Sequence, residues 1–475
     1  MSRAPATAAL FAAAAVLSAF TILREIGPHD EGLMLQAAAR MAGGQWPYRD
    51  FWWNYGPGQP LVLGALWKAF GPSLLSWRIL RVGLDATVAV LAWALVRRQS
   101  PGWLALLAWA AVAAAMAWPT GPGANPAAVA LVLWALLVVR RSGVVAGALC
   151  GLAALFRPEL GAAGALAVAL AGGGVAAIVA AAIAGVVLWA PFLAVAPGDV
   201  EHDMAGFLRV QHLQRLPLPL DYDGPVDPNK VLEFYFPLVL LGGSALWLVR
   251  RRALWLAPLI AAGVLYLLGR PDEFHLAPLS VILAIALAVA AARERSRALR
   301  GLLVAALALV AVHGLERRIG QALHPPALAA VPAPVADGVK TSPADARALR
   351  AVLARVHALT RPGAPIFVAP PRFDRVRLGD PLLYVLAGRP NPTRYDVMQP
   401  GVVTTADVQR EMIGDLARAR PRLLVRWRDR RALATEPNGS GRSSGVRLLD
   451  DWLRAHYGAP QRFGPYVLLR ARRTG

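Results

Sequence analysis

The stretch HDEGLMLQAAARMAGGQWPYRDFWWNYGPGQP, residues 29–60, follows the first long apolar segment of the chain and precedes the second. It begins with the adjacent carboxylates Asp30 and Glu31, and it carries six aromatic residues between Trp46 and Tyr55. Such a concentration of polar and aromatic groups between two apolar segments predicts a loop at the outer face of a membrane. Asp30 is its leading candidate for a catalytic group.

The composition places the rest of the chain in a lipid bilayer. Of the 475 residues, 56% are hydrophobic and only 17% are charged, whereas about a quarter of a soluble domain is charged. The net charge of +21 would suggest nucleic acid as a partner of a soluble protein. Here much of the positive charge lies in short loops between apolar runs, where arginines orient membrane proteins, so we expect no nucleic-acid partner. The single cysteine, Cys150, excludes an intrachain disulfide.

Long Ala/Leu/Val runs predict about eleven transmembrane helices. The runs cover residues 5–23, 75–96, 102–118, 125–139, 142–156, 160–172, 174–196, 231–249, 253–268, 276–292 and 299–313. Basic clusters fall at every second junction, at residues 97–98, 140–141, 250–252 and 293–300. By the positive-inside rule these junctions are cytoplasmic. We therefore expect a multi-pass protein of a bacterial cytoplasmic (inner) membrane, with its N-terminus inside and the loop 24–74 outside.

Two consecutive runs, 142–156 and 160–172, are short for a span and are separated by Arg157-Pro158-Glu159. Fusing them would invert everything downstream and would put the basic cluster at 250–252 outside. The charge pattern therefore favours two short helices with Arg157 at the outer surface, and a broken helix that lines a polar cavity is also compatible with it.

A small soluble domain of alternating helices and strands is expected at the C-terminal end. We divide the chain into a transmembrane domain 1–313, which includes the loop 24–74, a Pro/Ala-rich linker 314–340, and an extracytoplasmic α/β domain 341–475. Helices are expected at 342–360, 380–386, 404–419 and 445–457, and strands at 365–369, 422–427 and 465–469.

Residues 30–42 have the periodicity of a helix lying along the membrane surface, and Gly43-Gly44 would end it. Asp30 and Glu31 then stand at its N-terminus, where the helix dipole stabilises anions. Asp30 could simply cap the helix, or it could be an ionised carboxylate suited to general-base catalysis. The second charge of Glu31 and the position next to a membrane span favour the catalytic interpretation.

Other polar and aromatic residues of the outer loops each have a structural and a functional interpretation. The aromatic run that ends at Tyr55 could be an interfacial belt or a platform for a sugar or lipid chain. Arg49 and Asp50 could form an exposed pair or a hydrogen-bonding clamp. Charged groups at the outer ends of spans could bind substrate or could snorkel to the headgroups; they are Arg78, Arg157, Glu159, Arg270 and His275. No spacing indicates a metal site or an acyl-transfer nucleophile.

Several of these segments together resemble one superfamily of membrane enzymes. The matching segments are Asp30-Glu31-Gly32, Pro47-Tyr48-Arg49-Asp50-Phe51, Gly56-Pro57, Gly71-Pro72-Ser73, Arg78, Phe156-Arg157-Pro158-Glu159, Gly269-Arg270-Pro271-Asp272 and His275-Leu276. On these residues the chain resembles the GT-C glycosyltransferases, and within them the family-39-like group with protein O-mannosyltransferases and aminoarabinose transferases.

The resemblance implies an EC 2.4-class enzyme that transfers one sugar, with inversion, from a polyprenyl-phosphate carrier to an acceptor on the outer face. Asp30 would be the general base, and Glu31 would orient the acceptor or Asp30. The lipid-phosphate leaving group needs cations, for which Arg78, Arg157, Arg270 and His275 are candidates. Some relatives carry Lys-Pro-Pro in the turn after the aromatic residues, where this chain has 55–60, Tyr-Gly-Pro-Gly-Gln-Pro, without a lysine. We expect neither a metal nor another cofactor.

Two other classes of function stay open on the sequence. A transporter or flippase would place ionisable groups near the bilayer midplane on broken helices, whereas here the charges gather at one end of the spans. A non-catalytic relative would only bind polyprenyl-linked lipids. The identities of the sugar and of the glycan, lipid or protein acceptor are not encoded in any motif that we find.

Overall fold

The computed structural model of the protein describes residues 3–117, 125–221, 226–250 and 254–472. These residues form two compact units. The first, here called the helical unit, contains Met1–Ile22, Arg78–Pro191 and Pro217–Pro325. The second, here called the mixed unit, contains Leu23–Trp77, Phe192–Leu216 and Pro326–Gly475. The residue boundaries drawn from the sequence for the transmembrane domain, linker and C-terminal domain remain predictions.

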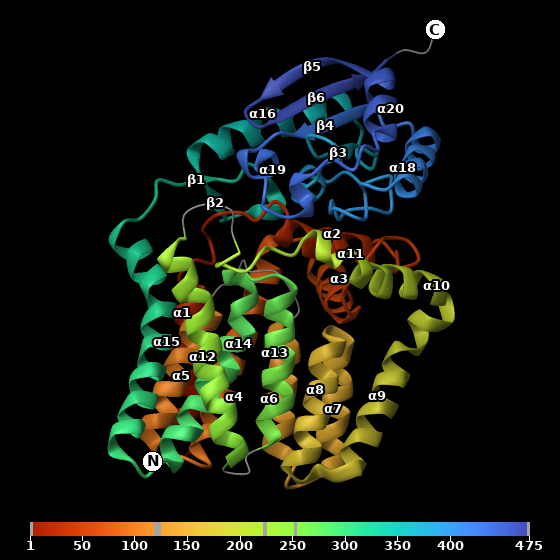
Figure 1. Ribbon diagram of the computed structural model, residues 1–475. Coiled ribbons are helices and arrows are strands. Elements are labelled where there is room, and N and C mark those ends of the chain that lie inside the picture. The colour runs from red at the N-terminus through yellow and green to blue at the C-terminus, as the bar shows by residue number, and fades with distance from the viewer. Residues whose placement is uncertain (1–2, 118–124, 222–225, 251–253, 473–475) are drawn as a thin grey trace. The chain divides into compact units, whose positions relative to one another are not determined.

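Helices occupy each apolar run that the sequence singles out. They are α1 (Arg3–Ala19), α4 (Leu74–Arg97), α5 (Gly102–Met116), α6 (Asn125–Val138), α7 (Gly143–Phe156), α8 (Pro158–Val168), α9 (Gly174–Val195), α12 (Pro228–Arg250), α13 (Ala257–Gly269), α14 (Glu273–Arg293) and α15 (Arg297–Leu323). Figure 1 shows α5 and α15 running side by side. The mostly helical fold class is therefore confirmed.

Among the described residues, four helical segments are long and apolar enough to cross a membrane: Leu74–Arg97, Pro158–Val195, His275–Arg293 and Arg297–Leu323. Five more apolar helices are shorter, so the number of about eleven spans remains a prediction. The expected outer loop 119–124 and residues 251–252 of one basic cluster lie outside the described residues.

The break between α7 and α8 occurs where the sequence places it. Arg157 has extended backbone angles, φ −144° and ψ 96°, and Pro158 starts α8. Farther along, Gly172 has φ 115° at the junction of η1 (Ala169–Gly173) with α9. Three glycines of α7 then permit close packing against this segment, because a Cβ at each would lie 2.1–2.8 Å from a carbonyl oxygen. They are Gly143, Gly147 and Gly151.

The mixed unit combines the first loop with a small sheet domain. The loop forms α2 (Asp30–Ala42) and α3 (Gly58–Phe70), and residues after α9 form α10 (Pro197–Val200), η2 (Glu201–Ala205), α11 (Gly206–Val210) and η3 (Gln211–Leu213). The C-terminal part contains β1 (Ala329–Ala330), η5 (Pro334–Ala336), β2 (Lys340–Thr341), α16 (Pro343–Leu359), β3 (Phe367–Ala369), α17 (Leu382–Ala387), α18 (Ala406–Ala419), β4 (Leu423–Trp427), α19 (Arg430–Leu433), η6 (Gly439–Gly441), α20 (Leu448–His456), β5 (Tyr457–Phe463) and β6 (Tyr466–Ala471).

Four of these strands form a mixed sheet in the order β3-β4-β6-β5 (Figure 1). β3 and β4 are parallel, with Val368 opposite Val425, and the other two pairs are antiparallel. The small C-terminal α/β fold predicted from the sequence is thus present, and Ser342 caps α16 by accepting a hydrogen bond from the Asp345 amide at 3.1 Å. The sequence analysis did not predict β5, whose residues include Gly458 and Pro460 and whose pairing contains a register shift.

Helix α2 has the bounds expected from its periodicity, but it does not expose one polar face. Residues 31–38 and Arg40 are all buried. It packs against α3 and α17, and a Cβ on Gly32 would lie 2.5 Å from the backbone nitrogen of Leu382. The apolar stripe that suggested a helix on the membrane surface therefore contacts protein, and only a glycine allows this approach of α2 to α17.

Candidate functional site

The two adjacent carboxylates at the start of α2 have opposite environments. The Asp30 side chain is exposed, and within the described residues it makes no hydrogen bond or ion pair. The Glu31 side chain is completely buried and accepts a hydrogen bond at 3.0 Å from the Gly27 amide. His29 is the N-cap residue of α2, so Asp30 is a first-turn residue whose charge faces the positive end of the helix. Asp30 is therefore open to a reactant, whereas Glu31 holds the chain that leads into the helix.

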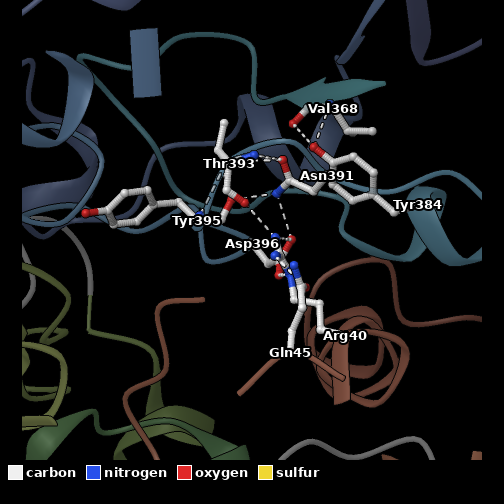
Figure 2. Close-up of polar contacts among 8 residues, drawn as sticks. All are labelled: Arg40, Gln45, Val368, Tyr384, Asn391, Thr393, Tyr395 and Asp396. Carbon is white, nitrogen blue, oxygen red and sulfur yellow. Dashed lines mark hydrogen bonds and ion pairs between the residues drawn. The ribbon is translucent and has the colours of Figure 1, made fainter. Parts of the chain in front are cut away.

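A buried ion pair near the other end of α2 fixes the helix to the C-terminal part of the mixed unit (Figure 2). Arg40 Nε lies 2.6 Å from Asp396 Oδ2, and Nη2 lies 3.2 Å from Oδ1. The guanidinium also donates to the Thr393 carbonyl at 2.6 Å and to Gln45 Oε1 at 3.1 Å. Asn391 donates to the same carboxylate at 2.8 Å. The position of α2 therefore depends on residues about 350 positions later in the sequence.

Arg394 holds the aromatic run of the first loop in the same way. Its Nη2 donates to the Tyr48 carbonyl at 2.6 Å, and its own carbonyl accepts from the Trp52 amide at 2.9 Å. The Arg394 guanidinium also lies 3.3 Å from Asp203, whose carboxylate accepts from the Trp53 amide at 3.1 Å. Tyr48, Trp52 and Trp53 are almost completely buried. These three side chains therefore form the core of the mixed unit and not an aromatic belt in contact with lipid.

The pKa of the Asp203 carboxyl lies above its ordinary value. Burial raises its pKa to about 6, although hydrogen bonding to His202 and the charge of Arg394 act in the opposite direction. Burial and the Asp203 charge also raise the pKa of Tyr48 well above its ordinary value. These shifts follow from packing charges into the core of the unit.

Three predicted site residues of the first loop interact mainly with their neighbours. Arg49 and Asp50 form a two-bond ion pair at 2.6 and 3.0 Å, and the Arg49 side chain is 46% exposed. The Arg49 hydrogen bond lowers the pKa of Asp50, which also accepts from the Trp46 amide at 2.7 Å. The Tyr55 carbonyl accepts from the Tyr48 hydroxyl at 2.6 Å. This is the exposed-pair arrangement for Arg49 and Asp50, stabilised within the turn.

In the helical unit, four predicted site residues gather around Tyr266, a residue of α13. The Arg157 guanidinium lies 4.7 Å from the centre of the Tyr266 ring, and the His275 ring lies 4.6 Å from it. Arg157 also pairs with Glu159 at 2.5 Å. The Tyr266 hydroxyl accepts from the Asn125 amide at 3.2 Å.

Asp272 joins the fourth of these residues, Arg270, to this cluster. Its carboxylate lies 2.8 Å from Arg270 Nε and 2.6 Å from His275 Nδ1, and it caps α14 through the His275 amide at 2.9 Å. Burial raises the pKa of Asp272, but its hydrogen bonds to His275 and the Arg270 charge outweigh burial, so the pKa lies below its ordinary value. Arg157, Glu159, Arg270 and His275 therefore form one cluster of alternating charge.

Arg78 is placed differently from these residues. It is completely buried, and its Nη1 donates to the Ile22 carbonyl at 2.7 Å. One turn farther, Arg81 forms a buried pair with Asp85 at 3.6 Å, and the Ser18 hydroxyl donates to the same carboxylate at 2.8 Å. Arg78 thus contacts the end of the first apolar segment.

Several residues that organise these clusters were not predicted from the sequence. Tyr266 is a single aromatic residue within an apolar run, Asp203 lies in the short helix η2, and Arg394 and Asp396 lie in a loop. For Asp272 the sequence offered a signal, because Gly269-Arg270-Pro271-Asp272 carries two opposite charges separated by one proline. Among the described residues, no group of three or more His, Cys, Asp or Glu side chains could hold a metal ion.

The fold is shared with a solved membrane protein. No family model matches the chain, and no curated protein matches it. ArnT from Cupriavidus metallidurans in the apo state superimposes with a TM-score of 0.61 and 15% identity over 98% of both chains. ArnT bound to undecaprenyl phosphate gives 0.58 and 14%, again over 98% of both. The chain therefore has the fold of ArnT, and the resemblance found in the sequence is confirmed at the level of the fold.

Proposed function

We propose that this protein is an EC 2.4-class glycosyltransferase that moves a single sugar from a polyprenyl-phosphate donor to an acceptor outside the cytoplasmic membrane. The observation that carries the proposal is the exposed Asp30 carboxylate at the N-terminus of a buried, firmly held helix. The fold of ArnT, one structure of which contains undecaprenyl phosphate, supports the choice of donor class.

Asp30 is the general base of the proposed reaction. Its carboxylate takes the proton from an acceptor hydroxyl while the hydroxyl oxygen attacks the anomeric carbon of the sugar. The bond between that carbon and the phosphate oxygen breaks, and the polyprenyl phosphate leaves with the electron pair. Attack from the face opposite the phosphate inverts the anomeric centre. An exposed carboxylate without a partner among the described residues suits this role, because its lone pairs are available to the acceptor.

Glu31 acts on Asp30 indirectly. Its buried carboxylate anchors the Gly27 amide, so it fixes the turn from which Asp30 projects. The ion pair of Arg40 with Asp396 holds the same helix from its C-terminal half. Of the two roles predicted for Glu31, orienting Asp30 is the one that complete burial favours.

The cluster around Tyr266 supplies positive charge to the lipid-phosphate leaving group. The Arg157 side chain is 9% exposed, whereas the side chain of its partner Glu159 is 45% exposed. A phosphate can therefore replace Glu159 as the partner of Arg157 without burying a new charge. Arg270 and His275 both contact the Asp272 carboxylate and complete the cationic set. Arg78 is a further candidate.

The proposed membrane arrangement follows the distribution of basic residues. About eleven spans, with the N-terminus inside, put the catalytic loop 24–74 and the α/β domain 341–475 outside, after the linker 314–340. Accessibility of single introduced cysteines to a membrane-impermeant thiol reagent tests this arrangement, after Cys150 is replaced by alanine. Labelling at position 30 and at position 442 from the outside is expected, and labelling at position 141 is not.

Turnover of a polyprenyl-phosphate sugar by the purified protein, with and without the Asp30→Asn change, tests the chemistry. Loss of the base is expected to lower kcat by about 10²- to 10⁴-fold. Asp407→Asn is the matched control, because Asp407 is also an exposed aspartate in the first turn of a helix of the mixed unit. Full activity of Asp30→Asn with its true substrates would exclude Asp30 as the base.

The buried pair of Arg81 with Asp85 keeps a transporter or flippase as the second candidate, because ionisable groups inside a membrane-spanning helix commonly mark a transport path. Movement of a labelled polyprenyl phosphate between leaflets of reconstituted vesicles, without sugar transfer, would support it. Binding of the lipid with neither movement nor transfer would indicate a non-catalytic binder.

A further inference from the structure

A cleft of about 770 Å³ lies within the mixed unit, between the first loop and the C-terminal part. Gln36 and Arg40 of α2 and Trp67 of α3 line one side, and His357, Arg389 and residues 384–388 line the other. Its size is that of a site for a small molecule. None of the lining residues is acidic. The candidate catalytic residues Asp30 and Glu31 do not line it.

The first observation that points to a ligand in this cleft is the Gln36 side chain, which lines it. Gln36 is only 4% exposed, and within the described residues its amide makes no hydrogen bond. The Gln36 amide is not among the buried polar atoms that lack a partner, so its donor and acceptor are accessible from the cleft. Because Gln36 lines the cleft, a polar ligand in the cleft can supply the missing donor and acceptor.

Arg389 gives the second sign, because its charge has no carboxylate partner among the described residues. It is 9% exposed, and its four hydrogen bonds go to neutral oxygens, namely the Thr360 hydroxyl and carbonyl and the carbonyls of Ala387 and Gly388. A guanidinium has five N–H donors, so at least one is left. The other lining arginine, Arg40, is already paired with Asp396 (Figure 2). The cleft therefore carries uncompensated positive charge.

The walls between these polar groups are apolar, with Trp67 and three prolines, at 72, 334 and 390. A sugar ring has apolar C–H faces for such walls and hydroxyls for amides. An aliphatic chain would leave the Gln36 amide without a partner. We propose that this cleft binds a saccharide that carries a carboxylate or phosphate, as part of the acceptor of the transferase. The assignment to the acceptor rests on the function proposed above.

Binding of small sugars to the purified full-length protein tests the proposal without requiring turnover. Saturation-transfer difference NMR titrations would compare glucuronate, glucose 6-phosphate and glucose. We expect at least one of the two anionic sugars to bind about tenfold more tightly than glucose, because it gains a charge-assisted hydrogen bond. Which of the two binds distinguishes a carboxylate from a phosphate ligand. Equal binding of all three, or binding of decanoate in place of the sugars, would overturn the proposal.

Gln36→Leu is the variant that separates a binding role from a structural one. The change keeps the volume and removes an amide that has no partner within the part of the chain that the structure describes, so the unfolding temperature should stay the same or rise. Binding of the anionic sugar should weaken about tenfold. Gln59→Leu is the matched control, because Gln59 is equally buried, its Nε2 has no partner among the described residues, and it does not line the cleft. Unchanged binding in Gln36→Leu, or equal weakening in both variants, would contradict the proposal.

Two further variants keep the result interpretable. His357 lines the cleft and is exposed, so His357→Ala should also weaken binding of the anionic sugar. This variant replaces Gln36→Leu as the test if Gln36→Leu does not fold. Asp30→Asn should lower turnover by about 10²- to 10⁴-fold and leave sugar binding intact. Sugar binding by a wild type that transfers no sugar would refute the proposed enzyme but not the cleft, whereas transfer without binding in the cleft would refute the cleft alone.

Discussion

Neutralising Asp396 tests whether the C-terminal part of the chain holds helix α2 in place. In Asp396→Asn the Arg40 guanidinium stays 6% exposed, but it keeps only neutral acceptors, the Thr393 carbonyl and Gln45 Oε1. Breaking a buried ion pair from one side costs about 3–5 kcal/mol. We take the lower value, about 3 kcal/mol, because the asparagine oxygen still accepts a hydrogen bond.

Amide hydrogen exchange of α2, residues 30–42, measures this cost locally. A loss of about 3 kcal/mol corresponds to a roughly 100-fold faster exchange of the protected amides of the helix. Asp407→Asn serves as the control, because it breaks an exposed pair with Arg410 that contributes at most about 1 kcal/mol.

The double variant Arg40→Met with Asp396→Leu separates the cost of an uncompensated charge from the value of the pair itself. Replacing both partners by apolar groups of similar volume should restore most of the protection. Exchange within threefold of wild type in Asp396→Asn would refute the view that this ion pair fixes α2. A double variant as unstable as the single one would show that the cost does not come from the isolated Arg40 charge.

Three further perturbations have outcomes that the structure defines. Gly32→Ala should destabilise the mixed unit by about 1–3 kcal/mol, because the added Cβ would lie 2.5 Å from the Leu382 backbone nitrogen. Thermal unfolding measures this loss. Gly43→Ala is the control and should leave the unfolding temperature nearly unchanged, because its Cβ would lie 3.4 Å from the nearest atoms, two carbonyl oxygens. Burial raises the pKa of Asp380 to about 7, above its value in the unfolded chain, so the native state binds this proton more tightly. The free energy of unfolding should therefore fall by up to about 4 kcal/mol as the pH rises from about 4 to about 7. In urea unfolding, Asp380→Asn should show a smaller fall over the same pH range. Arg157→Gln should lower kcat/KM for the lipid-linked donor by about 10²- to 10³-fold, and turnover at subsaturating donor measures it.

Local signals in the sequence located the helices well, because each depends on residues close in the chain. The period of the apolar residues and the pair Gly43-Gly44 placed α2 at 30–42, as observed. Pro158 next to Arg157 marked the end of α7. Strand β5 was not predicted, because Gly458 and Pro460 interrupt the alternation of apolar and polar residues that indicates a strand. Its pairing with β6 is also irregular.

The sequence did not predict that Asp30 is exposed and Glu31 is buried. Asp30 and Glu31 have the same charge and differ by one position, yet one is exposed and the other is completely buried. Their burial depends on which faces of α2 are covered by α3 and α17, and α17 comes some 350 residues later. The periodicity of a single helix cannot reveal such partners.

The sequence by itself determined that the chain is a mostly helical protein rich in apolar helices, with a small C-terminal α/β fold and an acidic, aromatic first loop. Hydrophobic patterning and helix-end signals suffice for this because they act over a few residues. Only the tertiary structure decided that Arg394 and Asp396 hold that loop, and that Tyr266 gathers Arg157 and His275. Those contacts join residues far apart in the chain. Their free energy comes from burying charges and rings together, which no local pattern records.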